Sequence, residues 1–154
     1  AAIAEAVERT DIGHLLDRPF TALSGGEKAR ASLARVLAQR TEVVLLDEPT
    51  AALDLRHQEE VMIVARSLAR AGRAVVVVLH DLSLAASRAD RIAMVDLGRI
   101  VAVGTPEEVL TPERVAEVYG IGVHVLTDTP DGHLIVVPRR RPGGEVPDAS
   151  SPRL

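Results

Sequence analysis

Four consecutive branched apolar residues at positions 43–46 run directly into Asp47 and Glu48. An apolar run bounded by charge is typical of a strand buried on both faces, as in a parallel sheet covered by helices. Pro49 follows and stops the strand from continuing. In open α/β sheets, chemistry lies at the carboxyl ends of such strands. An Asp there can hold Mg²⁺ and a Glu can act on water, although two acids also follow ordinary strands by chance.

A second apolar run, at residues 74–79, ends in His80 and Asp81. A helix predicted over residues 55–71 separates the two runs, and this alternation indicates an α/β fold with parallel strands. We therefore expect His80 to lie beside the first pair of carboxylates. A single histidine at a strand end is usually structural, so its position alone does not assign a role.

The start of a third segment has the chemistry of an anion site. A helix is predicted from Ser24 to about Gln39, and Ser24 with Glu27 forms the pattern of a capping box. That pattern alone mostly marks a helix start. Gly25 and Gly26, however, leave the first amides open to an anion at the positive end of the helix dipole. A phosphate would fit there, whereas Asp54, ahead of the next helix, is explained locally as an N-cap.

The rest of the chain is expected to be architectural. Turn and cap signals predict a helix over residues 82–89, two strands joined by a tight turn, two helices that begin with threonine and proline, and a hairpin around Asp131 and Gly132. The four strands are expected at residues 91–95, 99–103, 123–126 and 134–137, and the helix starts at Thr105 and Thr111. Residues 1–137 would form one domain. Residues 138–154 mix proline, glycine, serine and arginine and are expected to be disordered.

The composition excludes several classes of function. The 154 residues are 47% hydrophobic and 26% charged, as in an ordinary globular domain, and the net charge of -4 argues against a nucleic-acid partner. The absence of cysteine excludes disulfides and thiolate metal sites. No run approaches the roughly 18 apolar residues that span a bilayer, so we expect any membrane connection to come through a partner.

With these motifs in this order, the chain resembles the nucleotide-binding subunits of ABC transporters. The resemblance identifies residues 23–27 as the signature motif, residues 43–47 as the Walker B strand, residues 51–54 as the D-loop and His80 as the switch histidine. It implies the C-terminal part of a P-loop NTPase-type domain, with a mainly parallel sheet flanked by helices and a small C-terminal hairpin. Residues 2–17 would be the end of its helical subdomain.

The resemblance also implies a role for each residue. Two subunits would close around two MgATP molecules. Asp47 would position Mg²⁺, Glu48 would be the catalytic base, and His80 would steady the γ-phosphate. The signature would contact ATP held by the opposite subunit, and Asp54 would reach across the dimer. The residues that bind the cofactor ATP would be Ser24, Gly25, Gly26, Glu27 and Asp54.

Three further stretches, at residues 54–58, 80–86 and 104–110, are similar to ATPase subunits of bacterial importers for haem, ferric siderophores and vitamin B12. Residues 115–125 and 136–138 favour the haem importers. The resemblance implies a homodimer or pairing with an intact ABC ATPase subunit, transmembrane permease subunits, and indirectly a periplasmic or surface substrate-binding protein. It implies a peripheral location at the cytoplasmic face of the membrane.

The only lysine, Lys28, follows Glu27, so this sequence has no G-x-x-x-x-G-K-[ST] loop. Because the family carries that Walker A loop nearer the N-terminus, we expect the chain to be N-terminally truncated and inactive alone. Two alternatives stay open. One is a non-catalytic remnant that only completes a partner's ATP site. The other is a soluble ABC ATPase not linked to transport, against which the acidic net charge and the importer-like stretches argue.

Overall fold

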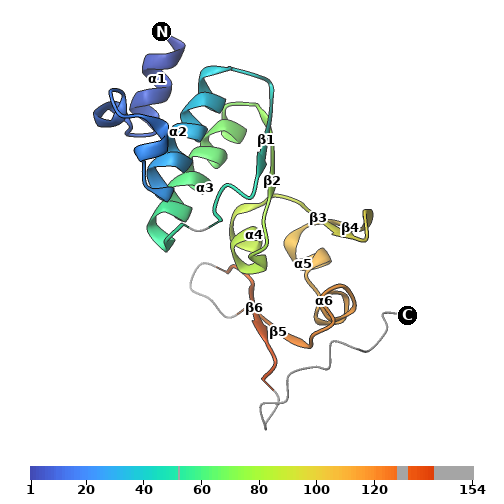
Figure 1. Ribbon diagram of the computed structural model, residues 1–154. Helices are drawn as coiled ribbons and strands as arrows, with labels where there is room; N and C mark the ends of the chain where they lie inside the picture. Colours follow the sequence, from blue (N-terminus) through green and yellow to red (C-terminus); the bar gives the residue numbers. More distant parts are fainter. Residues whose placement is uncertain (52, 128–131, 141–154) are drawn as a thin grey trace. The chain divides into compact units, whose positions relative to one another are not determined.

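The computed structural model describes residues 1–51, 53–127 and 132–140 and divides into two compact units, Ala1–Asp81 and Leu82–Leu154 (Figure 1). Each unit is described by itself. Within the described residues, no helix is long and apolar enough to cross a membrane.

The first unit contains two parallel strands and three helices of two or more turns. Its strands are β1 (Val43–Asp47) and β2 (Ala74–Val78), and its helices are α1 (Ala2–Arg9), α2 (Gly25–Ala38) and α3 (Leu55–Arg70), with short 3₁₀ turns η1 (Gly13–Leu15) and η2 (Phe20–Ala22). The parallel register pairs Val43 with Ala74 and Asp47 with Val78. Both predicted strands and both long predicted helices are therefore confirmed.

One face of the β1–β2 pair carries the core of this unit. Val44 and Leu46 point into a cluster with apolar side chains of α2 and α3, and Val75 and Val77 pack against the same cluster. The helical residues of this cluster are Leu33, Ala34 and Leu37 of α2 and Val61, Ala65 and Leu68 of α3. Because these residues recur three or four positions apart, each helix presents one apolar stripe to the sheet.

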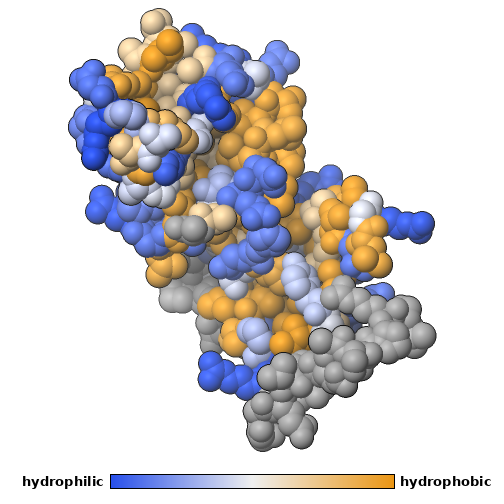
Figure 2. Space-filling model, viewed as in Figure 1, coloured by the Kyte–Doolittle hydropathy of each residue, from blue (hydrophilic) through white to orange (hydrophobic). Residues whose placement is uncertain are grey.

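The prediction that β1 is buried on both faces is wrong for the described residues. Leu45 is 70% exposed and Val43 and Val76 are also exposed, whereas the neighbouring Leu46 is only 7% exposed. The reason is that α2 and α3 cover a single face, and strand side chains alternate between faces. Figure 2 shows apolar surface gathered over these strands. The apolar strand β1 is therefore buried on one face and exposed on the other.

The start of α2 is fixed by a reciprocal cap. The Glu27 backbone N–H donates to Ser24 Oγ (3.3 Å), and the Ser24 N–H donates to Glu27 Oε2 (2.7 Å). The amide and then the hydroxyl of Ser24 hold the pKa of the Glu27 carboxyl below its usual value, with a smaller contribution from Arg18. The predicted capping box is therefore confirmed, and the carboxylate form of Glu27 is favoured in the folded chain.

The second unit combines two antiparallel hairpins with short helices. Its elements are α4 (Leu82–Arg88), β3 (Ile92–Asp96), β4 (Arg99–Gly104), α5 (Pro106–Val109), α6 (Pro112–Tyr119), β5 (Val123–Leu126) and β6 (Ile135–Pro138). Thr105 and Thr111 cap α5 and α6, with proline in the first turn of each, as predicted. The core of the unit is centred on Val109, Leu110 and Val115.

The two hairpins turn in different ways. Leu97 and Gly98 both have positive φ and join Asp96 to Arg99, a two-residue loop of the kind that suits the twist of a hairpin. The β5–β6 pairing is also confirmed, but Leu126 pairs with Ile135, so that loop is longer than two residues. Gly132 has a positive φ, whereas Asp131 lies outside the described residues.

The expected boundary of the tail is shifted slightly. Pro138 pairs with Val123, and the Arg139 N–H donates to the Gly122 carbonyl (2.8 Å), so the last strand reaches past residue 137. The predicted disorder of residues 141–154 falls outside the described residues.

Adjacent leucines on β1 give a direct test of the one-sided core. We expect Leu46→Ala to lower the free energy of unfolding by about 2–5 kcal/mol, because it leaves a cavity under α2 and α3. We expect Leu45→Ala to change it by less than about 0.5 kcal/mol, because that side chain is exposed. Urea denaturation of the 154-residue chain measures both. Equal losses would show that both faces are buried.

The cap of α2 predicts a pH dependence. Because the pKa of Glu27 is lowered on folding, its contribution to stability is complete above the usual glutamate pKa of about 4.3 and is lost as the pH falls through the lower folded-state value. NMR titration should place the Glu27 pKa below that of an unstructured glutamate, and Ser24→Ala should raise it. A Glu27 pKa at or above the usual value would contradict the cap geometry.

Candidate functional site

The ends of β1 and β2 bring the predicted catalytic pair together. Because the two strands are parallel, their carboxyl ends meet at one edge. There His80 Nε2 lies 2.7 Å from Glu48 Oε1, although the two residues are far apart in the sequence. A carboxylate only accepts hydrogen bonds, so Nε2 is the protonated nitrogen and donates to Glu48. The predicted position of His80 beside the carboxylates is confirmed.

Both members of this pair remain accessible. The side chain of Glu48 is 45% exposed and that of His80 is 79% exposed. The bond to His80 uses Oε1 and leaves Oε2 available to a water molecule. A carboxylate that is oriented by a neighbour and open to water has the geometry of a general base.

The backbone at Glu48 is unusual and aims its side chain. Glu48 has φ of +46°, a left-handed conformation that costs a non-glycine residue about 1–2 kcal/mol. Its N–H still donates to the Val78 carbonyl (3.2 Å), and its own carbonyl accepts from the Ala51 N–H (3.1 Å). The chain therefore leaves the strand in a tight turn at Glu48. Non-glycine residues held in this region cluster at functional sites.

Asp47 ends the exposed face of β1, in phase with Val43 and Leu45. Within the described ranges, no group of three or more histidine, aspartate or glutamate side chains could hold a metal ion. Asp47 thus offers one hard oxygen ligand. That suits Mg²⁺ bound with nucleotide, because this ion commonly uses one or two carboxylates and completes its shell with phosphate oxygens and water.

The first turn of α2 presents backbone amides. The first amides of a helix have no carbonyl partner within the helix, and the capping box satisfies those of Ser24 and Glu27 only. A Cβ built on Gly25 would meet nothing within 4 Å, so the first turn is not crowded at this position. The Gly25 and Gly26 amides lie at the positive end of the helix dipole, where an anion would be favoured.

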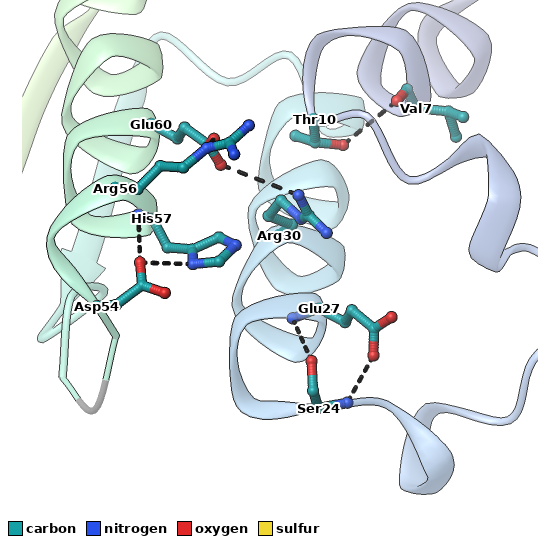
Figure 3. Close-up of polar contacts among 9 residues, drawn as sticks. All are labelled: Val7, Thr10, Ser24, Glu27, Arg30, Asp54, Arg56, His57 and Glu60. Atoms are coloured by element: carbon teal, nitrogen blue, oxygen red, sulfur yellow. Dashed lines mark hydrogen bonds and ion pairs between the residues drawn. The ribbon is translucent and has the colours of Figure 1, made fainter.

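Asp54 is the N-cap of α3, as its local sequence predicts. Its Oδ1 accepts from the His57 N–H (2.9 Å) and is 2.7 Å from His57 Nδ1 (Figure 3). The His57 amide and then its ring hold the pKa of Asp54 below the usual aspartate value. The Asp54 side chain is 67% exposed. The implied second role for Asp54, at a partner's site, remains a prediction.

The structure gives His57 a specific place between α2 and α3. Besides its bond to Asp54, its ring lies against Gly26 of α2. The three-residue spacing from an N-cap aspartate is a signal for the first contact. The second contact joins residues distant in sequence, and nothing in the sequence indicates it.

Comparisons with known proteins agree with this arrangement. The family model described as ABC transporter matches residues 1–51, a segment that contains both the glycine pair and the Asp47, Glu48 strand end. Hemin import ATP-binding protein HmuV of Rhodococcus jostii (strain RHA1) is 60% identical over 139 residues, which are 90% of this chain and 48% of that protein. HmuV of Streptomyces coelicolor is 58% identical over 142 residues, 92% of this chain and 51% of that protein. The chain spans about half the length of the curated relatives it matches.

Solved structures show the same fold. A metal-chelate type ABC transporter in an inward-facing conformation superposes with a TM-score of 0.80 at 26% identity, covering 90% of this chain and 57% of that one. A dimeric bacterial ABC transporter cassette, MJ0796, superposes with a TM-score of 0.62 at 28% identity, covering 68% of this chain and 46% of that one. By sequence and by fold, the chain is similar to the ATP-binding subunits of ABC transporters.

Proposed function

We propose that this chain provides the signature and Walker B part of an ATP-hydrolysing subunit that powers a bacterial importer. The observation that carries the proposal is the 2.7 Å contact between Glu48 and His80 at the carboxyl ends of two parallel strands. The match of residues 1–51 to the ABC transporter family supports it, because that segment includes the anion-binding amides and both carboxylates.

In the proposed reaction, Glu48 Oε2 accepts a proton from a water molecule that attacks the γ-phosphorus of ATP. The bond from that phosphorus to the ADP oxygen breaks, and phosphate and ADP are released. His80 holds Glu48 through Oε1 and keeps Oε2 directed at the water. Asp47 would hold Mg²⁺, which would supply charge neutralisation at the phosphates. The protein's contribution is thus positioning and electrostatic stabilisation, as in other phosphoryl transfers.

The helix start at Gly25 and Gly26 has a separate part in this proposal. Its open amides would bind the γ-phosphate of an ATP molecule held by a second subunit, with Ser24 and Glu27 keeping the turn in shape. The exposed carboxylate of Asp54 would face the same neighbour. Pairing with a second copy, or with another subunit of the family, would therefore complete each site. The dimeric cassette among the similar structures supports this arrangement.

The names of the relatives support haem as the cargo of the transporter. The relatives with 58–60% identity are hemin import ATP-binding proteins, and the metal-chelate type transporter has a similar fold. We place the subunit at the cytoplasmic face of the membrane, bound to permease subunits that work with a substrate-binding protein. Cargo recognition would belong to those partners.

A second candidate function follows from the single lysine. Lys28 lies in the first turns of α2, beside the capping box, and cannot serve a Walker A loop. A chain limited to these residues would lend its amide surface to an intact subunit without hydrolysing ATP itself.

Glu48→Gln tests the proposed base. In the full-length protein that carries this sequence, we expect the substitution to abolish ATP turnover and preserve MgATP binding, because an amide cannot accept the proton from water. Glu42→Gln is the control, because Glu42 is exposed just before β1. Turnover is followed by phosphate release and binding by calorimetry. Substantial hydrolysis by Glu48→Gln would remove Glu48 as the base.

The amide surface is tested by association. We expect this 154-residue chain to bind no MgATP alone, yet to associate with an intact subunit when MgATP is added. Gly25→Asp should abolish that association, because a carboxylate in the open space before the amides repels a phosphate. Arg35→Ala, an exposed change on the same helix, should not. Two outcomes would contradict the proposal that these amides complete an ATP site on another subunit. One is tight MgATP binding by the chain alone, and the other is association that Gly25→Asp does not weaken.

A further inference from the structure

His57 contacts two of the segments assigned to the proposed site. From the first turn of α3, its ring Nδ1 lies 2.7 Å from Asp54 Oδ1, and its backbone N–H donates to the same oxygen at 2.9 Å (Figure 3). Because the carboxylate can only accept, Nδ1 carries the proton. Two hydrogen bonds from one residue therefore fix the carboxylate of Asp54 in one orientation.

The same ring faces Gly26 of α2. A Cβ built on Gly26 would stand 3.5 Å from His57 Cδ2 and 3.6 Å from Cγ and Nε2, which is van der Waals contact. The His57 side chain is half-buried, with 29% of it exposed. His57 thus bridges the N-cap carboxylate of one helix and the anion-binding turn of another.

Further contacts lie on both sides of the His57 ring. Gln58 Nε2 donates to the Leu53 carbonyl (3.0 Å), so the residue just before Asp54 is tied to α3. On the other side, Arg30 of α2 lies 3.9 Å from Glu60 of α3, and Arg56 donates to that same carboxylate at 3.0 Å. The Arg30–Glu60 pair therefore links the second turns of α2 and α3.

We propose that His57 is a positioning residue that holds the Asp54 carboxylate and the first turn of α2 at Gly26 in one fixed arrangement. This inference rests on the proposed function, in which both groups face a nucleotide on a second subunit. Backbone amides stabilise the charge that develops in the transition state only when they are already oriented before the reaction. We therefore expect His57 to affect the turnover number. A subunit binds its own ATP without using the α2 turn, because that turn faces the ATP held by the second subunit. The affinity for MgATP should therefore not depend on His57.

Three substitutions in the full-length protein that carries this sequence separate the two contacts. His57→Asn keeps a short donor for Asp54 and loses the ring over Gly26. His57→Phe keeps a ring over Gly26 and loses the donor, and His57→Ala loses both. His124→Ala, which removes an exposed histidine on β5, is the matched control. The measurements are turnover number, MgATP affinity by calorimetry, and the urea midpoint of unfolding.

We expect His57→Ala to lower the turnover number about tenfold or more while MgATP affinity stays within about twofold. His57→Asn and His57→Phe should each recover less than half of the lost turnover, because neither spans both contacts. Wild-type turnover in any of the three variants would overturn the proposal. So would a loss of turnover that weaker MgATP binding, or the fraction of protein unfolded at the assay temperature, accounts for in full.

A double-mutant cycle tests the bridge without nucleotide. Gly26→Ala places a methyl group against the His57 ring, so its effect on the unfolding midpoint should differ between the wild-type and His57→Ala backgrounds. Equal shifts in both backgrounds would overturn the contact. If the wild-type protein hydrolyses no ATP, the proposed function fails, and this cycle alone decides whether His57 couples the two segments.

Discussion

The parallel pairing of β1 with β2 is the interaction on which the rest of this structure depends. Its register places Asp47 opposite Val78, so the chain leaves both strands at the same edge. The Glu48 N–H adds a hydrogen bond to the Val78 carbonyl beyond the last paired residue. A shift of one residue would turn the apolar set of a strand to the opposite face and carry its terminal side chain away from its partner. The contact between Glu48 and His80 is therefore a consequence of sheet register.

Helix starts form the second organising constraint, because the same residues serve structure and chemistry. Ser24 and Glu27 satisfy each other's amides, which stabilises α2 and leaves the Gly25 and Gly26 amides open. Asp54 uses one carboxylate oxygen as a cap and keeps the other exposed. At each of these helix starts, a residue can therefore cap the helix and also take part in the proposed site. The cap fixes the backbone, and the unused polar atoms face outward.

The sequence was sufficient to predict the elements and the proximity of His80 to Glu48, because their signals are local or follow from parallel strands. Apolar runs, caps and turn residues mark each element, and strand ends bring His80 to Glu48. It could not predict that Leu45 is exposed, because burial of the second face depends on what packs there. Nor could it predict the left-handed backbone of Glu48, which a turn after the strand imposes. The contact of His57 with Gly26 joins two helices, and no periodicity within either encodes it.

Strand alternation links the open face of the sheet to the proposed chemistry. Asp47 stands in phase with Val43 and Leu45, so the carboxylate proposed to hold Mg²⁺ lies at the end of an exposed apolar face. Each exposed valine or leucine there forgoes about 1.5–3 kcal/mol of burial. Removing water from that face would also lower the dielectric constant around Asp47, which strengthens its attraction to a cation. If Asp47 holds Mg²⁺ as proposed, packing of this face and affinity for the ion would be coupled through one strand.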